Sequence, residues 1–370
     1  MSFCVLMRIL HIINSLGVAG AEKLLVDVLP RYKSFGIEAS LLCLNGEKTI
    51  FYDTLSQNFD GKIMDLGKGS IYNPLHIFRL KKHLKNFDVV HVHLFPSLYL
   101  VAIAKFLFRL KVPLLFTEHS TNNRRIDHFI FRMLDRLIYS FYSGVFAITP
   151  AVKLKLVEKL KYDANRCYVI YNGINVAVFK NALPYPKREF FEDENAILLI
   201  QTSRFQKGKD QKTVIKALAL LPNHFKLLLV GNGELKAECV ELVNQLHLKE
   251  RVLFLGVRAD IPNLIMTADV VIQSSNWEGF GLTAVEGMAA GKPVVASNVS
   301  GLNAIVESYG LLFNTRDEQM LASCVEQLMA DPEFYNETAK KCAQRADHFG
   351  LEKMLAAQIE VYKTVLSHNI

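Results

Sequence analysis

The stretch DVVIQSSNWEGFGLTAVEGMAAGKPVVAS, residues 269–297, contains two apolar runs separated by a loop and a helical segment. Gly279 and Gly281 interrupt the chain before the helical segment, and Gly291, followed by Pro293, is placed to end it. Near-continuous apolar strands joined by a helix are typical of a parallel sheet that is covered on both faces. The stretch therefore predicts a strand–helix–strand unit of an α/β fold.

The same alternation runs along the whole chain. Strand-like runs in the first half are RILHII, EASLLCL, DVVHVHL, PLLFTEH and GVFAIT, and those in the second half are AILLIQTS, FKLLLVG, RVLFLG, DVVIQSS and PVVAS. Helical patterns lie between them, for example at 21–32, 211–220 and 234–246. Two such series predict two Rossmann-like domains that face each other across a cleft.

The domain boundary is expected near residues 172–183, where turn residues, prolines and charges gather. We expect an N-terminal domain over 1–175 and a C-terminal domain over 176–350. The last helix, about 351–370, could pack back on the first domain.

Composition excludes several classes of protein. Of the 370 residues, 51% are hydrophobic and 21% are charged, which excludes a disordered chain. The six cysteines form no CxxC pair, which argues against a disulfide framework or a zinc site and fits the reducing cytoplasm. No uncharged apolar run reaches about 18 residues, so no membrane span is expected, and the first apolar segment is interpreted as a strand rather than a signal peptide.

Positive charge is concentrated in the first half of the chain. Residues 1–180 carry 24 Lys+Arg and 13 Asp+Glu, whereas residues 181–370 carry 19 and 23. The excess suggests an anionic partner, but no nucleic-acid motif is present, and nucleic acid is not expected. Arginines at 124, 125, 132 and 136 lie among apolar residues, which suggests docking on an anionic membrane at the inner face of the plasma membrane, with core packing as the alternative for the apolar residues.

Two glutamates, Glu278 and Glu286, lie on either side of the start of the predicted helix, with seven residues between them. A helix start offers free N–H groups to an anion. Glu286 is suited to accept hydrogen bonds from ribose hydroxyls, and Glu278 from hydroxyls of a second group. The alternative is that both are ordinary solvated carboxylates.

A basic loop, RFQKGKD, follows another predicted strand and precedes a helix. Arg204, Lys207 and Lys209 would be unfavourable beside a helix start without an anion, and a diphosphate would satisfy them. A merely solvated loop is the alternative. Near the N-terminus, Gly20 opens a helix without a GxGxxG pattern, which weakens the case for a nicotinamide dinucleotide but allows close approach of a phosphate or sugar.

Three histidines attract attention in the first half. His119 ends a predicted strand, where it could face a ligand or be a structural residue. His91 and His93 alternate along another strand and point to one face. They could form a metal pair, but without nearby acidic or cysteine ligands we favour packing.

The chain resembles the retaining GT-B glycosyltransferases of family 4, in particular the bacterial members that build surface glycans. The resemblance covers nearly the whole chain. Its most specific part is the E-x7-E signature in NWEGFGLTAVEGMAAGKPVVAS, and AGAEK, YNGIN, LLLVGNGEL and RVLFLG support it. It implies that the C-terminal domain holds a nucleotide-sugar donor, expected to be a UDP-sugar. It also implies that the N-terminal domain binds the acceptor, a glycan or lipid-linked sugar.

The resemblance also implies residue roles. Glu278 would contact the donor sugar, Glu286 the ribose, Arg204 with a lysine the diphosphate, and His119 the reacting carbon. The remaining donor contacts would come from Gly20, Lys207, Lys209, Val257, Arg258, Gly279, Phe280, Gly281 and Leu282. An R-x4-K pattern selects Lys209 as the diphosphate lysine, whereas anchoring on the KG dipeptide selects Lys207, and Lys209 is preferred.

The resemblance implies how the reaction proceeds. Arg204, the lysine and the helix start would stabilise the departing diphosphate. No suitable DxD motif is present, so no metal or other cofactor is expected. The lack of a clear nucleophile suggests front-face attack with retention. The alternatives are a nicotinamide-dependent oxidoreductase, a sugar-nucleotide epimerase and a catalytically silent binding subunit.

Overall fold

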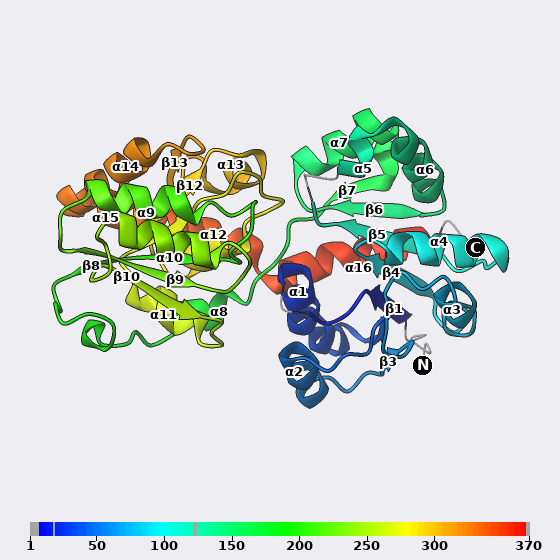
Figure 1. The fold of residues 1–370 in the computed structure, drawn as a ribbon. Coiled ribbons are helices and arrows are strands. Elements are labelled where there is room, and N and C mark those ends of the chain that lie inside the picture. Colours follow the sequence, from blue (N-terminus) through cyan, green and yellow to red (C-terminus); the bar gives the residue numbers. More distant parts are fainter. Residues whose placement is uncertain (1–6, 18, 121–123, 368–370) are drawn as a thin grey trace. The chain divides into compact units, whose positions relative to one another are not determined.

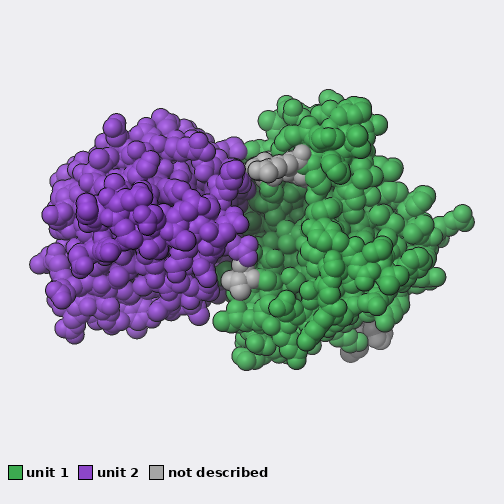
Figure 2. All heavy atoms as spheres, in the orientation of Figure 1, with its two compact units in different colours: residues 1–173, 351–370 green, residues 174–350 purple. Residues whose placement is uncertain are grey.

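The structure is a computed structural model that describes residues 7–17, 19–120 and 124–367. It divides into two compact α/β units, residues 1–173 with 351–370 and residues 174–350 (Figure 2). The division falls two residues before the boundary expected at 175. Helix α16 (Leu351–Ser367) belongs to the first unit.

The first unit contains a seven-stranded sheet with helices on both faces (Figure 1). The strand order is β3-β2-β1-β4-β5-β6-β7, and every neighbouring pair is parallel. The strands are β1 Met7–Ile13, β2 Ile37–Cys43, β3 Ile63–Asp65, β4 Val89–His93, β5 Leu114–Glu118, β6 Gly144–Ala147 and β7 Cys167–Val169. The other helices are α1 Gly20–Val28, α2 Ile50–Asn58, α3 His76–Leu84, α4 Ser97–Leu107, α5 Arg124–Asp127, α6 Phe129–Ser140 and α7 Pro150–Leu160.

The second unit contains a six-stranded parallel sheet in the order β10-β9-β8-β11-β12-β13. The strands are β8 Ile197–Thr202, β9 Phe225–Val230, β10 Val252–Gly256, β11 Val270–Gln273, β12 Val294–Ser297 and β13 Leu311–Phe313. The helices are α8 Val176–Lys180, α9 Gln211–Leu220, α10 Lys236–Gln245, α11 Ile261–Thr267, α12 Leu282–Ala289, α13 Ser300–Val306, α14 Glu318–Ala330 and α15 Pro332–Ala346. The prediction of two Rossmann-like α/β domains is confirmed.

The strands that sequence reasoning missed are β3, β7 and β13. Each has three residues and lies at an edge of its sheet. Short edge strands carry too few residues to show a pattern, and they bury only part of their surface. Helix α1 is also shorter than the expected 21–32, because Pro30 lacks an N–H and the chain continues as the 3-10 helix Leu29–Phe35.

Helix α16 completes the core of the first unit. Leu351, Leu355 and Tyr362 are fully buried in one cluster with Leu24 and Leu25 of α1. The hydroxyl of Tyr362 lies 2.7 Å from Nδ1 of His91 on β4. The helix is therefore an internal part of a unit whose other elements end at residue 173.

Candidate functional site

The candidate site lies where the strand order of the second sheet changes direction. From β8 the chain adds β9 and β10 on one side, and β11, β12 and β13 lie on the other. In open parallel sheets, ligands bind beyond the carboxyl ends of the strands at this point. The loops that leave β8 and β11 carry the basic residues at 204, 207 and 209 and the glutamate at 278.

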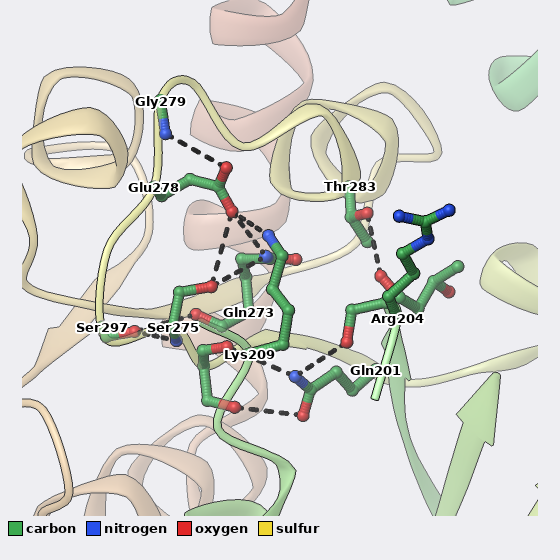
Figure 3. Close-up of polar contacts among 12 residues, drawn as sticks. Gln201, Arg204, Lys209, Gln273, Ser275, Glu278, Gly279, Thr283 and Ser297 are labelled. Carbon is green, nitrogen blue, oxygen red and sulfur yellow. Dashed lines mark hydrogen bonds and ion pairs between the residues drawn. The ribbon is translucent and has the colours of Figure 1, made fainter. Parts of the chain in front are cut away.

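Glu278 is the centre of a polar cluster (Figure 3). Its Oε2 forms an ion pair with Nζ of Lys209, and it also accepts from Nε2 of Gln273 at 3.3 Å and from Oγ of Ser275 at 3.4 Å. Its Oε1 accepts from the N–H of Gly279 at 3.1 Å. The two charged side chains are only 19% (Lys209) and 16% (Glu278) exposed. The ammonium group of Lys209 and these neutral donors thus orient the carboxylate.

Packing of the two loops explains why Lys209 turns toward Glu278. Lys209 pairs with Ser275 in an isolated antiparallel bridge, and a Cβ on Gly208 would lie 2.9 Å from the ring of Trp277. Only glycine lets the backbone lie this close to the indole. Lys207, one residue before this contact, is exposed. Of the two candidate lysines, Lys209 is the one that reaches the carboxylate.

Arg204 is exposed, and Figure 3 shows its guanidinium directed away from the pair of Lys209 and Glu278. Within the described part of the chain, no hydrogen bond or ion pair engages this guanidinium. Arg204 and Lys209, which are expected to hold one diphosphate together, therefore point to different places in this structure, because Lys209 is paired with Glu278.

Helix α12 begins at Leu282, directly after the loop that carries Glu278. Gly281 precedes it with a φ of +94°, and a Cβ there would lie 2.3 Å from Cδ2 of Leu302, so this position requires glycine. No side chain among the described residues caps the helix start, which leaves N–H groups of the first turn available to an anion. Oγ1 of Thr283 donates to the carbonyl oxygen of Thr202 at 3.0 Å and joins α12 to the end of β8.

The side chains of Glu286 and Phe280 are both buried rather than exposed at the surface. Glu286 is the fifth residue of α12 and is only 6% exposed, so it is not an ordinary solvated glutamate. Phe280 was expected to contact a donor, but its side chain is 2% exposed and packs edge-on against Phe349 with ring centroids 5.5 Å apart. The Phe280 ring is therefore part of the core of the second unit, and the expected donor contact of this residue stays a prediction that concerns its backbone.

The residues expected beside a nucleotide base come after β10. The side chain of Val257 is 63% exposed. The guanidinium of Arg258 is held by Asp260, with Nε 2.8 Å from Oδ1, and Tyr185 donates to the same carboxylate. The Arg258 side chain is therefore engaged within the loop, whereas its backbone lies close behind the strand end.

In the first unit, His119 follows β5 and Gly20 is the first residue of α1. Nε2 of His119 lies 3.3 Å from Nδ1 of His93. Burial lowers the pKa of His119 to about 4, so its imidazole is neutral at pH 7. His91 and His93 are buried, in line with the preferred packing interpretation. Sequence reasoning missed His11 on β1, whose strand register with β4 places it beside them.

Comparisons with known proteins agree with this arrangement. One family model, Glycosyltransferase Family 4, matches residues 18–178, and a second, Glycosyl transferases group 1, matches residues 186–349. The N-acetyl-alpha-D-glucosaminyl L-malate synthase of Bacillus anthracis is 28% identical over 292 residues, which is 76% of each chain. The N-acetylgalactosamine-N,N'-diacetylbacillosaminyl-diphospho-undecaprenol 4-alpha-N-acetylgalactosaminyltransferase of Campylobacter jejuni is 24% identical over 359 residues, 92% of this chain and 95% of its own.

Solved structures show the same fold. The crystal structure of Anabaena HepE in complex with UDP and glucose superposes with a TM-score of 0.86 at 25% identity, covering 97% of this chain and 100% of its own. The two family models together span both units of the present chain. The chain is therefore an enzyme of glycan biosynthesis with the GT-B fold, and it belongs to family 4 of the glycosyltransferases.

Proposed function

We propose that the enzyme transfers a sugar from a UDP-sugar, with retention of configuration, to a glycan or lipid-linked acceptor during surface polysaccharide synthesis on the cytoplasmic side of the membrane. The observation that carries the proposal is the Glu278–Lys209 cluster beside the uncapped start of α12. Two relatives support the substrates: Anabaena HepE was solved with UDP and glucose, and the name of the Campylobacter enzyme specifies a diphospho-undecaprenol acceptor.

In this proposal the second unit holds the donor. Glu286 accepts hydrogen bonds from the ribose, and Glu278 from hydroxyls of the transferred sugar. The exposed guanidinium of Arg204 and the N–H groups at the start of α12 receive the diphosphate. Negative charge grows on the diphosphate as the glycosidic bond breaks, so these groups stabilise the transition state more than the bound donor.

In this proposal Lys209 interacts with two anions in turn, the carboxylate of Glu278 and the diphosphate of the donor. In the described structure it neutralises the largely buried charge of Glu278. When a diphosphate arrives, the same ammonium group can turn toward the second anion. Sugar hydroxyls then take its place on Glu278.

The proposal includes transfer without a metal and by front-face attack. Arg204 and Lys209 supply the positive charge that a divalent ion would supply, and the leaving phosphate takes the proton of the acceptor hydroxyl. Transfer should therefore persist in EDTA, and NMR of the product should show the anomeric configuration of the donor. Loss of activity that Mg²⁺ or Mn²⁺ restores, or an inverted product, would contradict this part.

Thermal shift with a panel of UDP- and GDP-sugars tests the donor. A UDP-sugar should raise the melting temperature, and Glu286→Ala should weaken its affinity about ten-fold or more, because hydrogen bonds to a charged group contribute roughly 1.5–3 kcal/mol. Glu326→Ala, on an exposed position of α14, is the matched control. Unchanged affinity in folded Glu286→Ala, or stabilisation by GDP-sugars alone, would refute the donor assignment.

A second part of the proposal is reversible docking on an anionic membrane. None of the described helices has the length and apolar character needed to cross a bilayer. Helix α6, however, exposes Phe129 (65%), Ile130 (66%) and Leu137 (57%), and Phe131, Met133 and Leu134 are also exposed. Arg132 lies over the Phe129 ring at 5.8 Å, so a cation and an apolar surface occur together, as in interfacial helices.

The structure changes which arginines carry this proposal. Arg125 lies 4.2 Å over the Phe95 ring and 3.6 Å from Oδ1 of the buried Asp135. Its side chain is only 23% exposed, so it is a structural residue and not a lipid contact. The side chain of Arg124 lies outside the described residues.

Liposome flotation tests the docking. Binding to anionic vesicles, little binding to neutral ones and release in high salt are expected, because the Debye length falls from about 10 Å at 0.1 M to about 3 Å at 1 M. The triple substitution Phe129→Ser, Ile130→Ser and Arg132→Ala should abolish flotation. Leu183→Ser, at a 76% exposed position of the second unit, is the control. Equal flotation with both lipids, or none, would refute docking and favour a soluble acceptor.

A further inference from the structure

Three histidines of the first unit form a continuous chain of imidazole rings. Nδ1 of His11 lies 3.1 Å from Nε2 of His93, and Nδ1 of His93 lies 3.3 Å from Nε2 of His119. His11 and His93 are 1% and 4% exposed, whereas His119, at the end of β5, is partly exposed. The chain therefore leads from the core of the sheet to a residue at a strand end.

The rings are aligned as hydrogen-bonded pairs. The centroids of His11 and His93 are 5.4 Å apart and those of His93 and His119 are 5.6 Å apart. Each separation is close to the N···N distance plus the distance from each centroid to its nitrogen, so the two nitrogens face each other nearly on a straight line. This is the arrangement of an N–H···N hydrogen bond.

The same alignment argues against a metal ion in this cluster. His11, His91 and His93 have ligand atoms within 4.8 Å of one another. A shared zinc ion, about 2.0–2.1 Å from each nitrogen, would require both lone pairs to converge on a point beside the line that joins the nitrogens, whereas Nδ1 of His11 and Nε2 of His93 point at each other. Both ring nitrogens of His91 already have hydrogen-bond partners: Nδ1 lies 2.7 Å from the hydroxyl of Tyr362, and Nε2 lies 2.7 Å from the hydroxyl of Thr117.

The hydrogen bonds of the chain must all run in one direction. Burial lowers the pKa of His11 to about 3 and of His119 to about 4, and it holds the pKa of His93 well below 6.5, so each ring is neutral and has a single N–H. Two links among three rings leave two arrangements. The protons are either all directed toward His119 or all directed toward His11.

The inner end of the chain selects one arrangement. Nε2 of His11 is buried and has no hydrogen-bond partner among the described residues. A buried N–H without an acceptor is rarer and less favourable than an unused acceptor atom. His11 therefore carries its proton on Nδ1 and donates to His93, which donates from its own Nδ1 to Nε2 of His119.

We propose that His93 and His11 are positioning residues that fix His119 as the Nδ1–H tautomer. His119 then presents a neutral hydrogen-bond donor, rather than an acceptor, to a sugar oxygen. The tautomer of His119 follows from the hydrogen bonds among the three histidines alone, whereas its use in sugar binding rests on the proposed function. His119 in this state can hold a substrate oxygen but cannot accept the proton of an acceptor hydroxyl at Nδ1.

Long-range ¹H–¹⁵N NMR of histidine-labelled protein at pH 7 tests the tautomer without any substrate. We expect His119 to be protonated on Nδ1 in the free enzyme. His93→Phe removes the link, and His119 should then change to the Nε2–H tautomer. Since this readout needs no activity, it separates failure of this inference from failure of the proposed function.

Kinetics provide the second readout. His93→Phe should lower kcat about ten-fold with little change in UDP-sugar affinity, as expected for one lost oriented hydrogen bond. His93→Gln, which can donate and accept, should restore part of the rate, and His83→Phe on α3 is the control in the same unit. An Nε2–H tautomer in the wild type, an unchanged tautomer in folded His93→Phe, or a stoichiometric zinc ion in the purified protein would overturn the proposal. If His93→Phe fails to fold, the wild-type tautomer alone decides.

Discussion

Replacement of Lys209 by Met should expose the role of the ion pair at the centre of the site. The substitution preserves most of the stem but removes the ammonium group that pairs with Glu278, a side chain only 16% exposed that also accepts hydrogen bonds from Gln273, Ser275 and Gly279. Removing one partner of a largely buried charged pair costs about 1–3 kcal/mol or more, because the remaining carboxylate keeps its desolvation penalty. Glu278→Gln in the same protein removes that charge, so the double variant should recover a large part of the loss.

The only tryptophan of the chain, Trp277, makes this measurable. It lies against Gly208 in the same pair of loops, so its fluorescence during urea unfolding reports on the second unit. A double-mutant cycle for Lys209→Met and Glu278→Gln should give a coupling of about 1–3 kcal/mol. The same cycle with Lys207→Met should be additive, since Lys207 is exposed. Additivity in the Lys209 cycle would show that the ion pair does not form in solution and would refute the reasoning.

Three further outcomes are expected from the same structure. Gly281→Ala should destabilise the second unit and abolish UDP-sugar binding, because φ is +94° and the new Cβ would meet Leu302. The control Gly291→Ala, where φ is +68° and the space is open, should lower the free energy of unfolding by only about 1 kcal/mol. Arg204→Ala should lower kcat more than it weakens donor binding, and an equal effect on both would contradict transition-state stabilisation. Finally, burial lowers the pKa of His11 to about 3 and that of His119 to about 4. Below pH 6.5 the unfolded chain therefore binds protons that the folded chain does not, so the free energy of unfolding should fall from pH 7 toward pH 4. Hydrogen exchange in β1 and β4, corrected for intrinsic rates, measures this fall.

Much of the fold could be predicted because its central strands are rich in β-branched and other apolar residues. Strands such as β4 and β8 are buried on both faces, and such runs are visible in any single sequence. The edge strands β3, β7 and β13 were missed because three residues carry no period. Their place in the sheet depends on pairing with a neighbour rather than on their own pattern.

The position of the site could be predicted from sequence, but not which basic side chain pairs with Glu278. Parallel topology brings the loops after β8 and β11 to one edge, which is why Arg204, Lys209 and Glu278 could be placed together from sequence. Which cation meets the carboxylate depends on the close packing of Gly208 under Trp277, a contact between residues 69 positions apart. Burial of the Phe280 ring could not be predicted, because a residue between two loop glycines gives no sign of its burial.

The histidine chain was hidden for a different reason. His91 and His93 alternate visibly along β4, but His11 lies on β1 and His119 directly after β5, both distant in sequence. Their contact requires the order β1-β4-β5 and its register. Topology of this kind can be inferred for the sheet as a whole, but register is decided by side-chain packing that a single sequence does not reveal.

The return of α16 to the first unit bears on how the protein is made. The second unit is one continuous segment, 174–350, whereas the first needs residues that are translated only after that segment. Until α16 emerges from the ribosome, the apolar surface around Leu24, Leu25 and Tyr32 has no cover, and His91 lacks the Tyr362 hydroxyl. We therefore expect the second unit to complete its core during translation before the first does, a reversal of the usual N-to-C order. A nascent chain stalled before residue 351 should expose its first unit to proteases while its second is protected.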